Sequence, residues 1–99
     1  MRGQTNSNGI AIEIFTATIP TSWTGDTAPY TAEVAIAGML ATDTPMIDLV
    51  AADSFTDAEA QIEAWGYIYR AVTKADAITF YAIEKPEVAI PVQIRAVRK

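Results

Sequence analysis

The stretch ITFYAIEKPEVAIPVQI, residues 78–94, decides the fold class of this chain. Apolar residues alternate with their neighbours on both sides of the turn at 84–87, and this period of two is typical of β-strands. Because the connection is short, we predict an antiparallel hairpin. Pro91 cannot donate a ladder hydrogen bond, so the second strand is expected at a sheet edge, or paired on one side only. Four β-branched residues would then form an assembly surface: Val88, Ile90, Val92 and Ile94.

Three more alternating segments precede this stretch, at 10–15, 30–36 and 46–50. In the first, Ile10, Ile12 and Ile14 share one face, as expected of a strand. The connections between the segments are rich in Gly, Pro, Thr and Asp, which favour turns. We therefore predict three strands before the middle of the chain.

A helix is expected between these strands and the hairpin, at about 56–70. Thr56 and Glu59 have the spacing of a capping box, in which each side chain satisfies a free amide at the helix start. One apolar stripe follows at helical spacing and is expected to face the sheet: Ala58, Ile62, Trp65 and Tyr69.

The resulting order is βββαββ, which predicts an α+β fold of mainly antiparallel β-structure with about five strands and one amphipathic helix. A length of 99 residues suits one domain, and we place that β-rich module at 10–99. Residues 1–9 are polar and contain glycine, so we interpret them as a linker or a cloning remnant.

Composition excludes several classes of function. The formal charge is −5, which opposes nucleic-acid binding because phosphate recognition needs basic residues. The chain contains no cysteine and no histidine, so it lacks thiolate chemistry, the commonest general base and the commonest metal ligand. No apolar run is long enough to enter a membrane as a span, and no signal peptide is evident. We therefore expect no enzyme activity, no catalytic residues, no cofactor and no metal.

Carboxylates are the remaining candidates for chemistry. Asp43, Asp48 and Asp53 recur at intervals of five residues, but the glycine and glutamate of a calcium-binding loop are absent. We interpret these side chains as solvated turn and cap residues. Glu13 and Glu33 could in principle face each other as a glycosidase pair, although their spacing gives no support for it.

Aromatic residues offer the only candidate ligand-binding site. Trp23, Tyr30 and Tyr67 could together expose rings on a loop face, where aromatic rings stack on sugars. The alternative for Trp23 and Tyr30 is packing at the end of the core. Tyr67 lies off the helical stripe and is expected to be the most exposed of the three.

Half of the residues are apolar, more than one small domain readily buries, and this surplus suggests association between copies. The chain also resembles a small domain of tail-fibre and minor structural proteins from phages and prophages of Gram-positive gut bacteria. The resemblance spans residues 12–97. Four pieces carry it: Trp23-Thr24-Gly25 running to Pro29-Tyr30, then Val34-x-Ile36-x-Gly38, Asp43-Thr44-Pro45-Met46-Ile47-Asp48, and Glu63-Ala64-Trp65-Gly66.

This resemblance implies a structural module of the virion, without a catalytic motif to carry over. Proteins of this kind usually form homotrimers, so it implies a trimer and places the module in a tail fibre or baseplate. It also implies a receptor-binding contribution, with a host-surface glycan or protein as the partner. A carbohydrate-binding or adhesion domain of a bacterial surface protein is the alternative.

Overall fold

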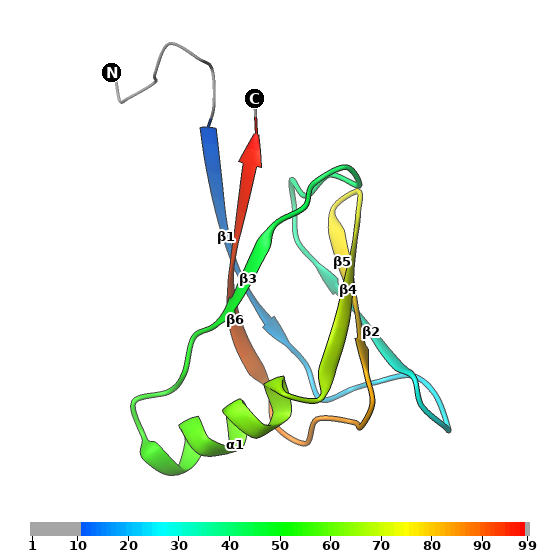
Figure 1. The fold of residues 1–99 in the computed structure, drawn as a ribbon, viewed down its shortest axis with the longest axis vertical. Helices are drawn as coiled ribbons and strands as arrows, with labels where there is room; N and C mark the ends of the chain where they lie inside the picture. Colours follow the sequence, from blue (N-terminus) through cyan, green and yellow to red (C-terminus); the bar gives the residue numbers. More distant parts are fainter. Residues whose placement is uncertain (1–10, 99) are drawn as a thin grey trace.

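The computed structural model describes residues 11–98, which form six strands and one helix. In chain order the elements are β1 (Ala11–Ile19), β2 (Tyr30–Ala35), β3 (Met46–Leu49), α1 (Phe55–Trp65), β4 (Ile68–Lys74), β5 (Ala77–Ala82) and β6 (Ile90–Arg98). Two antiparallel sheets of three strands, ordered β1-β6-β3 and β2-β5-β4, lie against each other, with α1 at one end (Figure 1). The predicted mainly antiparallel α+β class is therefore confirmed, with one strand more than expected.

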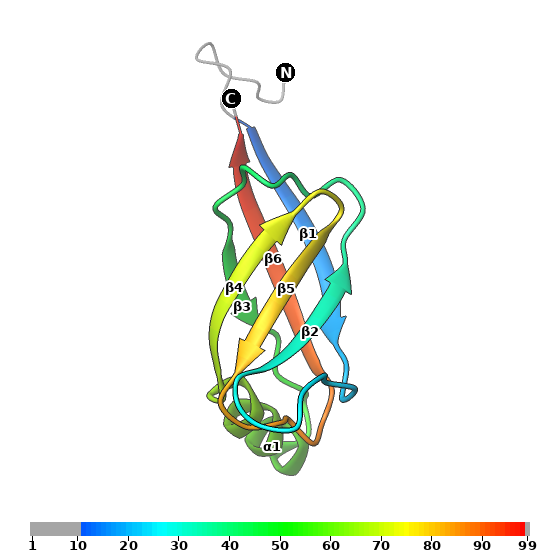
Figure 2. The same cartoon turned by 90° about the vertical axis from the view of Figure 1, so that its right-hand side faces the viewer.

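The core lies between the two sheets because each strand turns alternate side chains inward. Ile78 and Phe80 of β5 are fully buried and meet the inward residues of β6. Figure 2 shows the same arrangement from the side of the β2-β5-β4 sheet, with β1 and β6 behind it. Burial of alternating residues from two sheets is the main apolar contribution to stability in such a sandwich.

The predicted hairpin at 78–94 is wrong. β5 pairs with β2 and β4, whereas β6 pairs with β1 and β3 in the other sheet. The connection 83–89 therefore crosses from one sheet to the other, and Pro86 in it is buried. Two apolar-faced strands gain more by facing each other across the core than by lying in one sheet, so alternation alone did not identify the partner.

The expected edge position of Pro91 is also wrong, since β6 is the central strand of its sheet. Pro91 is tolerated there because β3 ends beside it: the last β3 residue, Leu49, pairs with Val92, and the Pro91 carbonyl accepts from Val50 N at 2.9 Å. No donor is required of Pro91 beyond that point. The expected assembly surface at 88–94 is consequently core, with Ile90, Val92 and Ile94 buried.

The helix is shorter than predicted and begins with a different cap. It ends at Trp65, and Gly66 occupies the C-cap position. Ser54 is the N-cap, and its hydroxyl accepts from Asp57 N at 3.4 Å, so the expected Thr56–Glu59 capping box is wrong. Ser, like Thr, favours this position, and two candidates lie two residues apart in the sequence.

The C-terminal part of the expected helix is β4. Tyr69 therefore does not face the core from a helix but is 55% exposed on a strand. Trp65 does pack against the core and is half-buried. The interpretation of 1–9 as a linker or remnant, like the position of Ile10, lies outside the described residues. Within residues 11–98, no helix has the length and apolar character of a membrane span.

Candidate functional site

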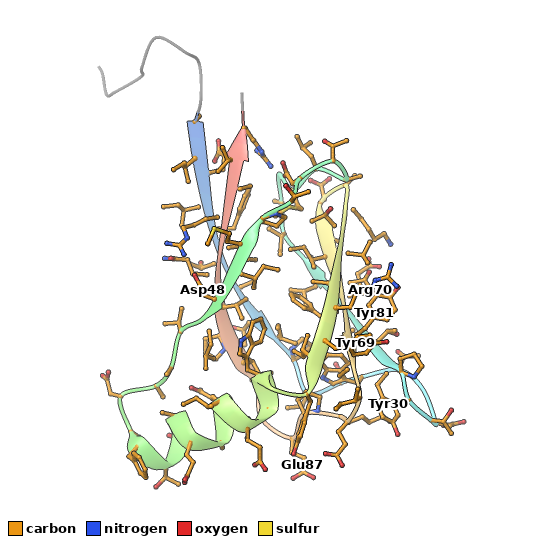
Figure 3. The ribbon with its side chains drawn as sticks, viewed as in Figure 1. Tyr30, Asp48, Tyr69, Arg70, Tyr81 and Glu87 are labelled. Atoms are coloured by element: carbon orange, nitrogen blue, oxygen red, sulfur yellow. The ribbon has the colours of Figure 1, made fainter. Side chains whose placement is uncertain are left out.

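A pocket of about 580 Å³ lies where α1, the start of β2 and the 83–89 connection meet. This volume is within the range of small-molecule sites in proteins. Figure 3 shows Tyr30 and Glu87, two of its residues, at the end of the molecule that carries α1. The pocket is lined by Tyr30, Ala60, Glu63, Ala64, Tyr67, Glu84, Lys85, Glu87 and Val88.

Two tyrosines and four charged side chains give this pocket its chemistry. The Lys85 ammonium lies 5.2 Å from the centroid of the Tyr30 ring, a cation–π contact. Burial, and then the nearby carboxylates of Glu63 and Glu84, raise the pKa of the Tyr67 phenol above its usual value. A tyrosine phenol is neutral at physiological pH even at its ordinary pKa, so Tyr67 can donate as well as accept a hydrogen bond.

The structure brings together two of the three aromatic residues expected to bind a ligand. Tyr30 and Tyr67 are half-buried and line the same pocket. Trp23 is only 8% exposed, belongs to the core, and donates its indole N–H to the Pro20 carbonyl at 3.0 Å. The packing alternative for Trp23 is thus the correct one, and Trp23 offers no ring face to a ligand.

The aspartates at five-residue spacing do not converge. Asp43 is buried and pairs with Arg98, whereas Asp48 pairs with Arg95, so the interpretation of Asp43 as a solvated turn residue is wrong. Glu13 and Glu33 lie on strands of different sheets, and Glu33 pairs with Lys74 at 2.8 Å. Across residues 11–98 no group of three acidic side chains is placed to hold a metal ion.

A second aromatic surface, on the outer face of the β2-β5-β4 sheet, was not expected from the sequence. The register shifts between Ile68 and Arg70, so that Tyr69 and Arg70 both oppose Tyr81. The Tyr69 and Tyr81 ring centroids are 6.4 Å apart, and the Arg70 guanidinium carbon lies 5.1 Å from the Tyr81 centroid (Figure 3). The aromatic and β-branched residues of 68–74, followed by a short turn, are the signal that could have indicated this strand.

The outer face of the β1-β6-β3 sheet carries an apolar patch. Ile12 pairs with Val97, while Ile14 and Met46 both pair with Arg95 from opposite sides, so these side chains share one face, with Arg95 between Ile14 and Met46. Each of the four apolar residues is about 60% exposed. We call this set the outer apolar patch: Ile12, Ile14, Met46 and Val97.

No protein-family model, no curated protein and no solved structure matches this chain. We therefore infer its function from the residues and geometry described above, together with the resemblance carried by its sequence motifs.

Proposed function

We propose that this chain is a non-enzymatic structural module of a phage virion, of the tail-fibre or baseplate type, which assembles with copies of itself. The trimer is the favoured state because the resemblance of residues 12–97 implies it. The module would contribute to receptor binding as part of that assembly.

The outer apolar patch is the observation that carries this proposal. Its four large side chains, 59–64% exposed, lie together on one sheet face. Isolated apolar side chains are ordinary on a protein surface, but a contiguous group commonly marks a contact between subunits. Arg95 is a basic residue that lies among the four apolar side chains, and it already forms an ion pair with Asp48. Self-contact across this face therefore leaves no unpaired guanidinium there.

The strand β1 extends this surface at its edge. It pairs only with β6, so the other side of its nine-residue backbone has no partner strand within the described residues. The edge contains no proline, and its one charged residue, Glu13, is on the same face as the buried Ala96 with which it pairs. A long unpaired edge favours pairing with another chain, and this inward-facing charge is the one feature that opposes such pairing. Ile12 and Ile14 lie on this edge strand, so that patch and edge form one continuous region.

Mass measurement in solution tests this proposal. We expect a trimer by light scattering, and dissociation or strong weakening of it in the Ile14→Glu variant. Ile83→Glu is the matched control, because Ile83 is also 59% exposed but lies outside the patch. A monomeric wild-type chain over a wide concentration range, or a trimer unaffected by Ile14→Glu, contradicts self-assembly through this face.

Ligand binding at the Tyr30–Tyr67 pocket is a second proposal, and it applies equally to a fibre tip and to the alternative adhesion domain. It is favoured by a concave site that combines aromatic walls with hydrogen-bonding groups. Glycan-array binding that is lost in Tyr30→Leu, with unchanged thermal stability, would support it. Binding that survives this substitution would place the glycan elsewhere.

A further inference from the structure

The pocket at α1 contains the ammonium group of one of the chain's own side chains, Lys85. Lys85 lines the pocket and places its ammonium 5.2 Å from the Tyr30 ring centroid. A distance below about 6 Å is the range in which a cation is attracted to the negative face of an aromatic ring. The Tyr30 ring is thus positioned to bind an ammonium group by a cation–π contact.

The carboxylates that line the pocket form no ion pair with Lys85. Three ion pairs are formed among residues 11–98, and none of them includes Lys85, although Glu63, Glu84 and Glu87 line the same pocket. Three carboxylates against one ammonium leave the pocket with an excess of negative charge. An incoming cation would therefore be attracted both by the ring and by this field.

A ligand can displace the Lys85 ammonium group from the Tyr30 ring. Lys85 lies in the exposed part of the 83–89 connection, on a side chain with several rotatable bonds, and a strongly hydrated ammonium loses little by moving into water. The neutral phenol of Tyr67 remains in the pocket as a hydrogen-bonding group. Displacement of Lys85 by another cation requires no change in the backbone.

We propose that this pocket binds the ammonium group of a ligand, seated on the Tyr30 ring in place of Lys85 and faced by Glu63, Glu84 and Glu87. This inference names the ligand class for the pocket and rests on the binding role proposed above. It does not depend on self-assembly, which light scattering of the patch variants tests separately. The ammonium group could be primary, as in an amino sugar or a lysine side chain, or quaternary, as in choline.

A pair of isosteric probes isolates the charge. Choline and 3,3-dimethylbutan-1-ol have nearly the same shape, but only choline is a cation, and ethanolamine represents a primary ammonium. Each is titrated into the isotopically labelled chain, and the backbone amide shifts of Glu84, Lys85, Glu87 and Val88 are followed by NMR. We expect saturable shifts with choline, with ethanolamine or with both, and affinity for the alcohol at least tenfold weaker. The better of the two amines identifies the type of ammonium group.

The Lys85→Met substitution should raise the affinity for the amine, whereas substitutions of the other pocket residues should lower it. Methionine keeps an unbranched side chain but removes the internal competitor, so the affinity for the better amine should rise about two- to five-fold, the usual strength of one exposed cation–π contact. Glu84→Gln should lower the affinity, and so should Tyr30→Leu. Because Glu84 is exposed, its substitution should leave the thermal unfolding curve unchanged and keeps the test valid if the Tyr30 variant folds poorly.

Three results would overturn the proposal. Equal binding of choline and its neutral isostere would make the pocket an apolar site. Weaker amine binding in Lys85→Met would make Lys85 a ligand-binding residue rather than a competitor. Absence of saturable shifts with either amine, in the wild type and in Lys85→Met, would exclude an ammonium site. Loss of glycan-array binding in Tyr30→Leu together with any of these results would keep the pocket as a binding site but reject its ammonium specificity.

Discussion

Asp43 and Arg98 form an ion pair that joins the loop before β3 to the last strand, across 55 positions of sequence. The Arg98 guanidinium donates to both oxygens of the Asp43 carboxylate, with Nε to Oδ1 at 3.2 Å, and also to the Gly38 carbonyl at 2.8 Å. Leu40 N donates to the same carboxylate at 3.0 Å. Asp43 is thus both buried and fully engaged, which is the condition under which a buried charge can be stabilising.

Replacement of Asp43 by Asn should lower stability in a pH-dependent way. Hydrogen bonds from Arg98 and then from the Leu40 amide hold the pKa of the Asp43 carboxyl below its usual value. A group with a lowered pKa in the folded state stabilises the fold above its unfolded pKa of about 3.9, and this contribution is lost as the pH falls through the folded pKa. The melting temperature of Asp43→Asn should therefore lie below that of the wild type at neutral pH, with the difference narrowing in acid.

Asp48→Asn is the control for this measurement, because Asp48 and its partner Arg95 are both exposed and such pairs contribute little. A melting temperature that is equally low for both variants, or a difference from the wild type that does not depend on pH, would contradict the role given to Asp43.

Replacement of Ser54 by Ala should destabilise the chain by about 0.5–1 kcal/mol, the usual cost of losing an N-cap. Within residues 11–98, the hydrogen bond that the Ser54 hydroxyl accepts is the only one from a side chain to the amides at the start of α1. Thr56 lies inside the first turn and has no such role, so Thr56→Ala should change the free energy of unfolding by less than that. Urea denaturation of the two variants compares them directly. A larger loss for Thr56→Ala would restore the capping box expected from the sequence.

The strands show how far the sequence determines this fold. Alternation correctly identified five strands and the fold class. In β1, however, the alternating residues Ile12 and Ile14 lie on the exposed face and not in the core. Alternation could not identify the partner of each strand, since a period of two describes a face of the strand and not a neighbour. Residues 78–94 read as a hairpin for this reason, while β5 and β6 face each other across the core.

The strand β4 was missed for a different reason. Tyr69 is eleven residues after Ala58 and fits a helical stripe, but Gly66 weakens a helix and Ile68 starts a strand that β5 can pair with. In β4 the backbone of these residues forms its hydrogen bonds with β5 instead of within a helix. The same limit applies to the site: the aromatic residues Tyr30 and Tyr67 were identifiable, but Lys85 became relevant only once the 83–89 connection was placed beside Tyr30.

Phe80 should be one of the most sensitive positions in the core. Its side chain is fully buried between the two sheets, so Phe80→Ala should lower the free energy of unfolding by about 3–5 kcal/mol. Trp65→Ala should cost less, although tryptophan is larger, because Trp65 is half-buried at the edge of the core. Guanidinium denaturation measures both. A larger loss for Trp65→Ala would mean that α1, rather than the centre of the sandwich, dominates the stability of the chain.

The Thr73 hydroxyl should stabilise the packing of the two sheets against each other. Its hydroxyl lies within hydrogen-bonding distance of two carbonyls of the loop before β3, Asp43 at 2.9 Å and Ala41 at 3.1 Å. β4 belongs to one sheet, and the loop leads into β3 of the other, so this hydroxyl joins β4 to the segment that enters the second sheet. Valine has nearly the same shape without the donor, and Thr73→Val should cost about 0.5–1.5 kcal/mol, the net value of a typical hydrogen bond.

Thr79→Val is the matched control, because Thr79 is also partly buried on a strand but its hydroxyl makes no hydrogen bond to the protein within residues 11–98. Valine favours strands, so this variant should be neutral or slightly more stable. Hydrogen exchange adds a local readout: in Thr73→Val the amide of Asp43, which donates to the Leu40 carbonyl, should exchange faster than in the wild type. If Thr73→Val and Thr79→Val unfold alike and the Asp43 amide keeps its protection, the Thr73 hydroxyl does not contribute to holding the two sheets together.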